Sequence, residues 1–65
     1  MQTRKRIISK EVYDRAIENG GHIRKDDQDQ AFTREEVLGY GVYHDEVLEE
    51  NEEYYVQFVI GGSCE

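Results

Sequence analysis

The sequence predicts an α+β fold in which one or two helices pack on a small antiparallel sheet of two or three strands. Three observations support this prediction: a helical spacing of apolar residues over 10–19, a helix-capping motif at Thr33, and an apolar and aromatic run of strand character after Tyr40. We take residues 1–65 as one small domain, because a chain of this length buries only about 60% of the surface that its unfolded form exposes. Stability should therefore be low, and association with a partner would increase it.

The two ends of the chain differ in composition from the rest. Residues 1–6 form a basic arm with Arg4, Lys5 and Arg6, and the two isoleucines that follow either begin a strand or pack on the core. Residues 61–65 contain two glycines and a serine and are expected to form a flexible tail.

The clearest helix is predicted after Ser9, whose side chain suits the N-cap position. The apolar residues of the following segment fall on one helical face: Val12, Tyr13, Ala16 and Ile17. Glu11 and Arg15 have the i,i+4 spacing of an ion pair on the outer side. Gly20 supplies the left-handed residue that ends a helix.

A polar stretch and a second, shorter helix follow. Residues 24–30 contain no apolar side chain, so we expect a solvated loop or a single loose turn, and their spacing does not match a calcium-binding loop. Thr33 and Glu36 have the spacing of a capping box, which predicts a helix of one or two turns that carries Val37 and Leu38 inward. Glycines soon after Leu38 limit its length.

The remainder of the chain has the pattern of strands. Residues 40–43, 46–49 and 53–60 are three such runs, with Asn51 in the turn between the last two, so we expect a C-terminal hairpin or a three-stranded meander. In the last run, alternate side chains share a face: Tyr54, Val56, Phe58 and Ile60 on one, Tyr55, Gln57 and Val59 on the other. Helices can cover only one of these faces. The N-terminal segment, a second copy or a target protein could cover the other.

No pattern in the sequence favours catalysis, a metal site or a cofactor. His22, His44, Asp45 and Cys64 are the conceivable reactive or zinc-binding group, but none of the usual close pairs of ligands is present. We therefore expect a protein that is not an enzyme, with no cofactor. A single cysteine fits a reducing compartment, and no run is apolar enough for a membrane span, so we expect a cytoplasmic protein.

Charge is distributed unevenly along the chain. The net charge is −7, but residues 1–34 sum to +2 and residues 35–65 to −9. Direct binding of nucleic acid is not expected, since the predicted sheet would repel phosphates. The asymmetry indicates either an interaction surface or simply a soluble acidic surface.

The predicted hairpin brings five glutamates together beside exposed tyrosines. The expected contact residues are Glu46, Glu49, Glu50, Glu52 and Glu53, with Tyr43, Tyr54 and Tyr55. Which of the tyrosines face solvent depends on strand register. This pattern favours docking on a basic protein or a nucleic-acid-handling complex, with aromatic side chains as anchors.

In size and charge the chain resembles small acidic proteins of phages and mobile elements, including anti-CRISPR and anti-restriction proteins. The resemblance implies an inhibitor that mimics nucleic acid. It rests on no motif, so it assigns no residue roles. The alternative is a non-catalytic assembly module that forms a homodimer through residues 54–60, in which the glutamates only protect the apolar strand from aggregation.

Overall fold

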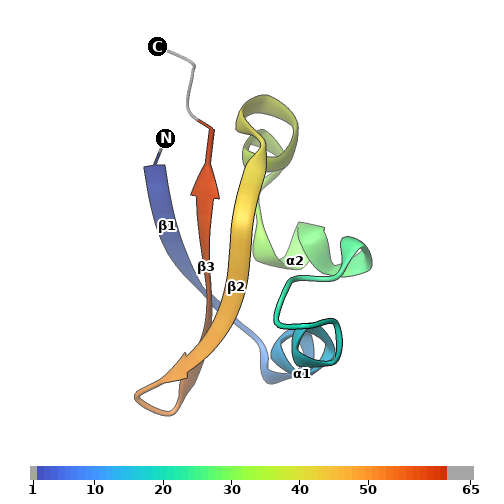
Figure 1. Cartoon of the computed structure of the whole chain (residues 1–65), viewed down its shortest axis with the longest axis vertical. Helices are drawn as coiled ribbons and strands as arrows, with labels where there is room; N and C mark the ends of the chain where they lie inside the picture. Colours follow the sequence, from blue (N-terminus) through green and yellow to red (C-terminus); the bar gives the residue numbers. More distant parts are fainter. Residues whose placement is uncertain (1, 62–65) are drawn as a thin grey trace.

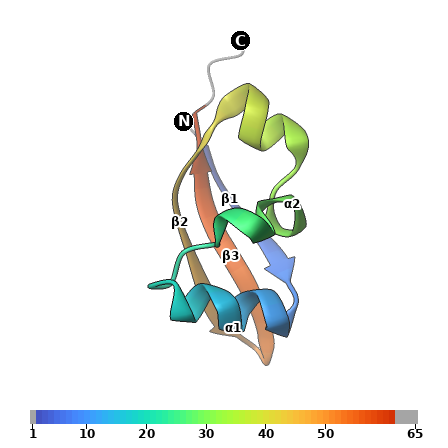
Figure 2. The same cartoon turned by 90° about the vertical axis from the view of Figure 1, so that its right-hand side faces the viewer.

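The computed structural model describes residues 2–61, which form a three-stranded antiparallel sheet with helical segments packed on one of its faces (Figure 1). The elements in chain order are β1 (Gln2–Ile8), α1 (Lys10–Glu18), η1 (Lys25–Asp27), α2 (Gln28–Ala31), η2 (Glu35–Tyr40), β2 (Val42–Glu50) and β3 (Glu53–Ile60). Turned by 90°, the molecule shows α1, α2 and the turns between them in front of the sheet (Figure 2). The predicted α+β fold is therefore confirmed.

The sheet has the order β1-β3-β2, so the C-terminal strand is central. β1 pairs with β3 along its whole length, from Gln2 opposite Ile60 to Ile8 opposite Tyr54. The basic residues at the N-terminus therefore lie within the sheet, and of the two roles considered for the isoleucines the strand is the correct one. The pairing joins opposite ends of the chain, which a local pattern does not reveal.

The hairpin of β2 and β3 is confirmed, but the meander is wrong. Residues 40–43 and 46–49 do not form two separate strands, because β2 runs from Val42 to Glu50 with an irregularity between Tyr43 and Glu46. His44 has a φ of 54° at this irregularity. A bulge inserts residues without ending a strand, and in the sequence it resembles a break.

The helix α1 matches its prediction at both ends. The Ser9 hydroxyl accepts a hydrogen bond from the Val12 N–H at 3.2 Å, and Gly20 has a φ of 82° just beyond the helix. The predicted ion pair of Glu11 with Arg15 is wrong, because Arg15 instead binds Asp27. That carboxylate is buried and accepts two hydrogen bonds from the guanidinium, so it offers Arg15 a better defined partner than an exposed glutamate does.

Asp27 corrects part of the prediction for residues 24–30. The segment is mostly exposed, as expected, but it forms two successive turns, η1 and α2, and buries the side chain of Asp27. The guanidinium of Arg15 holds the pKa of Asp27 below its usual value. A polar segment without apolar side chains can therefore still be anchored to the fold, through one paired charge.

The capping box before η2 is confirmed in both directions. The Thr33 N–H donates to the Glu36 carboxylate at 2.9 Å, and the Glu36 N–H donates to the Thr33 hydroxyl at 3.2 Å. The following turn is a wide π-helical one that closes with a bond from the Gly41 N–H to the Glu36 carbonyl. Val37 packs against the core, but Leu38 is 71% exposed, so its predicted inward position is wrong. Adjacent helical residues point about 100° apart, and Val37 takes the inward position.

The core lies between the sheet and the helical segments. Val56, Phe58 and Ile60 of β3 are fully buried there, as the alternation predicted. Phe58 packs edge-on against Phe32, with ring centroids 4.7 Å apart. The other buried apolar residues are Ile8, Val12, Ala16, Ile23 and Ala31.

Candidate functional site

The face of the sheet that points away from the helices is the main candidate surface. Side chains alternate along each strand, so half of them point away from the core. We call the surface formed by these residues the open face. Its members, from the strand register, are Thr3, Lys5, Ile7, Tyr43, Glu46, Leu48, Glu50, Glu53, Tyr55, Gln57 and Val59. Within residues 2–61 the packed helical segments all lie on the other side (Figure 2).

An apolar row crosses the open face from one edge strand to the other. Ile7 of β1 and Leu48 of β2 both stand opposite Tyr55 of β3. Ile7 is 60% exposed, and Tyr55 and Leu48 are half-buried. We call these three residues the apolar row. A surface of this kind, bordered by charged groups, is typical of an interaction site.

Carboxylates border the apolar row on both sides. Glu50 and Glu53 are direct neighbours across the hairpin on the side of its turn, and Glu46 lies on the other side, opposite Gln57. Like charges directly opposite one another destabilise a hairpin. Repulsion between Glu50 and Glu53 therefore lowers the stability of the hairpin. Two residues of opposite charge would stabilise the strand pairing at the same position.

The eight contact residues expected from the sequence are divided by the register. Five of them lie on the open face: Tyr43, Glu46, Glu50, Glu53 and Tyr55. Glu52 lies in the hairpin turn, while Glu49 and Tyr54 stand opposite each other on the helix-facing side. Tyr54 stacks on Tyr13 of α1 with ring centroids 4.6 Å apart, which makes it part of the packing of α1 on the sheet. Of the three tyrosines, Tyr43 and Tyr55 are thus the ones on the open face.

Two residues of the apolar row, Ile7 and Leu48, were missed by sequence reasoning. Leu48 had been included only in a short strand run, and Ile7 had no assigned face, because the pairing of β1 was unknown. The sequence contains no signal that assigns Ile7 to a face, because residues 3–8 are four polar residues followed by two isoleucines and do not alternate.

Lys5 shows how the open face holds a positive charge. Its ammonium group forms an ion pair with Glu50 and lies 4.7 Å from the centre of the Tyr55 ring. The hydrogen bond to Glu50 raises the pKa of Lys5. A cation over an aromatic ring beside a carboxylate is a favourable arrangement.

A buried charge cluster connects β1 to the helical side. Glu36 is 1% exposed and accepts hydrogen bonds from Arg6 at 2.7 and 3.0 Å and from Arg4. These bonds, chiefly those from Arg6, together with the capping bond from Thr33, lower the pKa of Glu36 to about 2 against the cost of burial. The sequence pattern identified Glu36 as a capping residue but not as the partner of two arginines from the other end of the chain.

Internal ion pairs use most of the basic side chains. Among the described residues six of them have an acidic partner: Arg4 and Arg6 with Glu36, Lys5 with Glu50, Lys10 with Asp14, Arg15 with Asp27, and Arg24 with Asp26. The hairpin glutamates other than Glu50 form no ion pair within residues 2–61. The positive charge of the N-terminal half is therefore largely neutralised inside the fold, and negative charge remains on the hairpin.

The residues considered for a reactive or metal site have other contacts. The carboxylate of Asp45 accepts a hydrogen bond from the Ile23 N–H at 2.6 Å, and its carbonyl contacts His22 Nδ1. These bonds fasten the loop after α1 to the edge of β2. No group of three potential ligands is found in the part of the chain that the structure describes, and Cys64 lies outside it.

The helices between residues 2 and 61 are all too short or too polar to cross a membrane. Comparison of the chain with protein-family models, with curated proteins and with solved structures gives no match. Only the surface of the protein therefore bears on its function.

Proposed function

We propose that this protein is a non-catalytic binding protein or inhibitor that docks its open face on a basic surface of another protein. One observation carries the proposal: an uncovered apolar row crosses all three strands, with carboxylates on both sides of it. Burial of the row would supply most of the binding energy, and the carboxylates would steer the approach and select a basic partner. We also propose that the protein acts in the cytoplasm, where it would meet its partner.

A nucleic-acid-handling protein is the partner class that fits best. Glu50 and Glu53 stand opposite each other on neighbouring strands, which lie about 4.8 Å apart, and this approaches the spacing of about 3.4 Å between phosphates along a DNA strand. Glu46 lies four residues from Glu50, about 14 Å further along β2. A basic groove that holds nucleic acid would attract this surface. In this proposal the protein competes with nucleic acid, as a counter-defence inhibitor of the anti-CRISPR or anti-restriction type, carried by a phage or mobile element, would.

The test is affinity capture from a lysate of the organism that carries the gene, at about 0.05 and about 0.5 M salt. The charge variant replaces Glu46, Glu50 and Glu53 of the open face by glutamine. Its matched control replaces Glu11, Glu18 and Glu35, which are equally exposed but lie on helical segments, and it changes the net charge by the same amount. We expect the wild type and the control to capture the same basic protein at low salt, and the charge variant to lose it.

A second pair of variants tests the apolar row. Ile7→Thr keeps a β-branched residue in β1 but removes apolar surface, and Ile17→Thr makes the same substitution on α1 at a position that is also exposed, at 50% against 60% for Ile7. We expect only Ile7→Thr to weaken capture, without changing its dependence on salt. Circular dichroism would show that every variant is folded.

The proposal fails if the charge variant, like its matched control, captures the same proteins as the wild type. It also fails if the protein captures only copies of itself, independently of salt, which would favour the homodimer alternative. A captured basic protein should in addition release a bound oligonucleotide when this protein is added. If it does not, the partner is basic but the mimicry of nucleic acid is wrong.

A further inference from the structure

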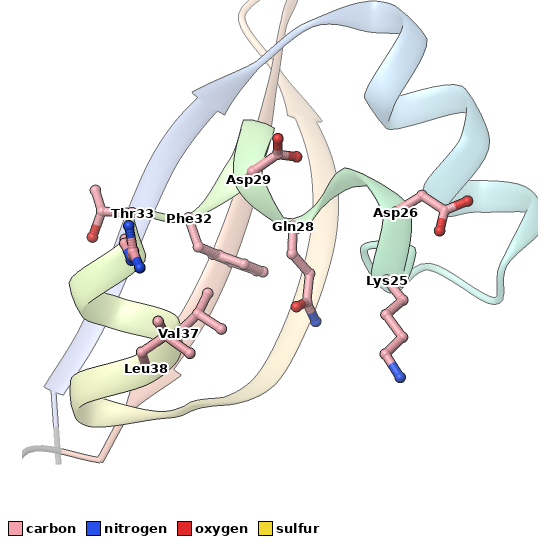
Figure 3. A pocket seen from close by; sticks show the side chains of 9 residues that line it. Lys25, Asp26, Gln28, Asp29, Phe32, Thr33, Val37 and Leu38 are labelled. Carbon is pink, nitrogen blue, oxygen red and sulfur yellow. The ribbon is translucent and has the colours of Figure 1, made fainter.

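A groove on the helical side of the molecule is separate from the open face. It has a volume of about 740 Å³ and lies between the η1–α2 segment and η2 (Figure 3). Phe32 is buried at its floor, Val37 is half-buried, and Leu38 is the most exposed large apolar side chain of the described residues. The remaining lining residues are polar: Lys25, Asp26, Gln28, Asp29, Thr33 and Arg34.

The two basic side chains at the groove form no ion pair with another described residue. Lys25 and Arg34 are the two basic residues that have no acidic partner within residues 2–61, and both line this groove. Lys25 and Thr33, which precedes Arg34, lie at opposite ends of it, with Phe32 and Val37 between them (Figure 3).

The acidic residues at the groove face elsewhere. Figure 3 shows the carboxylates of Asp26 and Asp29 pointing away from Val37 and Leu38. Asp26 also pairs with Arg24, at 3.8 Å. The groove therefore has an apolar middle and a basic residue near each end.

We propose that this groove binds a short acidic segment of a partner protein. An apolar side chain of the segment would contact Phe32, Val37 and Leu38, and acidic residues before and after it would reach Lys25 and Arg34. The proposal does not depend on the open face, because the groove lies on the other side of the sheet and selects the opposite charge.

An extended peptide fits the groove better than the other occupants do. The volume lies within the range of about 300 to 1,000 Å³ that is usual for ligand sites, and the two cations near its ends favour an elongated ligand with two separated carboxylates. A second copy of this chain is a poor occupant. The acidic residues of its hairpin belong to paired strands, in which Tyr54 packs on Tyr13 and Leu48 stands opposite Tyr55, so they are not available as an extended segment that could enter a groove.

The test is a titration of the isotope-labelled full chain with a capped peptide in which two leucines stand between two pairs of glutamates, followed by nuclear magnetic resonance. We expect shifts in the amide signals of Lys25, Gln28, Arg34 and Leu38, and a dissociation constant below about 1 mM. Two control peptides have lysine in place of each glutamate or serine in place of each leucine, and neither should produce these shifts.

Variants of the protein distinguish the charged contacts in the groove from the apolar ones. Lys25→Gln with Arg34→Gln should weaken binding about tenfold and reduce its dependence on salt. The control, Lys10→Gln, removes a positive charge from an exposed position on α1 that does not line the groove and should bind like the wild type. Leu38→Ser should weaken binding without changing the salt dependence, and its high exposure makes it safe for folding.

Several outcomes would overturn the proposal. Equal shifts with the lysine peptide, or shifts confined to residues 46–53, would show that the groove does not select acidic segments. Shifts at Lys25 and Leu38 that depend on protein concentration without peptide would identify a second copy as the occupant. Shifts with suberate, a free dicarboxylate, and none with the peptide would identify a small-molecule site.

Discussion

At the residue scale, Glu36 is the acidic residue with the most ion pairs among residues 2–61. One carboxylate caps η2, pairs with Arg4 and Arg6 and so attaches the edge strand β1 to the helical side. Leaving a buried charge without its partner is costly, so the three residues stabilise the fold only as a set.

The stability of the protein should fall in acid because of Glu36. Its pKa is about 2 in the folded protein and near 4.5 when unfolded, so the unfolded chain binds the proton more readily. The stabilisation, about 3 kcal/mol, is complete above pH 4.5 and is lost as the pH falls toward 2. The lowered pKa of Asp27 acts in the same direction. Urea unfolding between pH 7 and 3 measures this slope, and a free energy of unfolding that stays constant over that range would contradict it.

Replacement of Glu36 should separate this effect from a general effect of charge. We expect Glu36→Gln to lower the free energy of unfolding by roughly 3 to 5 kcal/mol at pH 7, because two arginines lose their partner. Its neighbour Glu35 is exposed, so Glu35→Gln should change stability by less than about 0.5 kcal/mol. Urea midpoints of the two variants provide the comparison, and equal losses would show that the buried cluster has no special role.

Two glycines should respond to alanine with opposite signs. A Cβ at Gly61 would lie 2.9 Å from Tyr43 Cε2 and 3.1 Å from the Tyr40 carbonyl, so Gly61→Ala should destabilise the protein by about 1 to 2 kcal/mol. A Cβ at Gly39 meets nothing within 4 Å in η2, so Gly39→Ala should stabilise it by about 0.5 to 1 kcal/mol. Thermal unfolding of both variants tests the pair. A stabilised Gly61→Ala would mean that the Tyr43 ring moves without cost.

At the element scale, the hairpin turn breaks a local rule. Asn51 and Glu52 both have positive φ, 54° and 65°, as a two-residue type I′ turn requires. Asparagine suits such a position, but glycine is strongly favoured at the second one and glutamate is not. A charged residue in a strained position at the tip of the acidic hairpin fits a role in contact with a partner.

Glu52→Gly should therefore stabilise the hairpin while it weakens the proposed docking. We expect an increase of about 1 kcal/mol in the free energy of unfolding, because the left-handed conformation costs glycine nothing. Glu52 is one of the contact residues expected from the sequence, so capture of the proposed basic partner should decrease in the same variant. An unchanged melting temperature would contradict the assignment of strain at this turn.

The elements also differ in how well the residues within each of them predict its structure. α1 has its cap, its apolar face and its stop within twelve consecutive residues, 9–20, and it appears as predicted. β2 depends on a bulge at His44 that only the partner strand makes visible. Local signals specify an element well when its hydrogen bonds are local, as in a helix, and poorly when they belong to another segment.

At the scale of the whole molecule, the net charge of −7 should make stability increase with moderate salt. Salt screens the repulsion among exposed hairpin carboxylates, while exposed ion pairs such as that of Lys5 with Glu50 contribute little and the cluster around Glu36 is screened less. We expect a higher melting temperature in about 0.5 M than in about 0.02 M sodium chloride. A lower one would mean that surface ion pairs outweigh the repulsion.

The candidate surface illustrates the same division between local and distant information. The sequence pattern showed that glutamates and tyrosines gather near the hairpin, but not which of them share a face. The register places Tyr55 outward and Tyr54 inward, and the pairing of β1 adds Ile7 to the outward side. A shift of one residue would have reversed these assignments, so no inspection of residues 46–60 alone could have made them.

Local patterns along the chain were enough to predict the fold class, α1, the capping box, the hairpin and the helix-facing residues Val56, Phe58 and Ile60, because each depends on side chains only a few positions apart. The tertiary structure alone decided that β1 completes the sheet, that Arg4 and Arg6 converge on Glu36, and that Leu38 is exposed beside a groove. These features join segments about thirty or more residues apart, or depend on which of two adjacent residues turns inward. The physical reason is that pairing partners and burial are properties of the packed molecule, whereas caps, turns and periodicity are properties of the local chain.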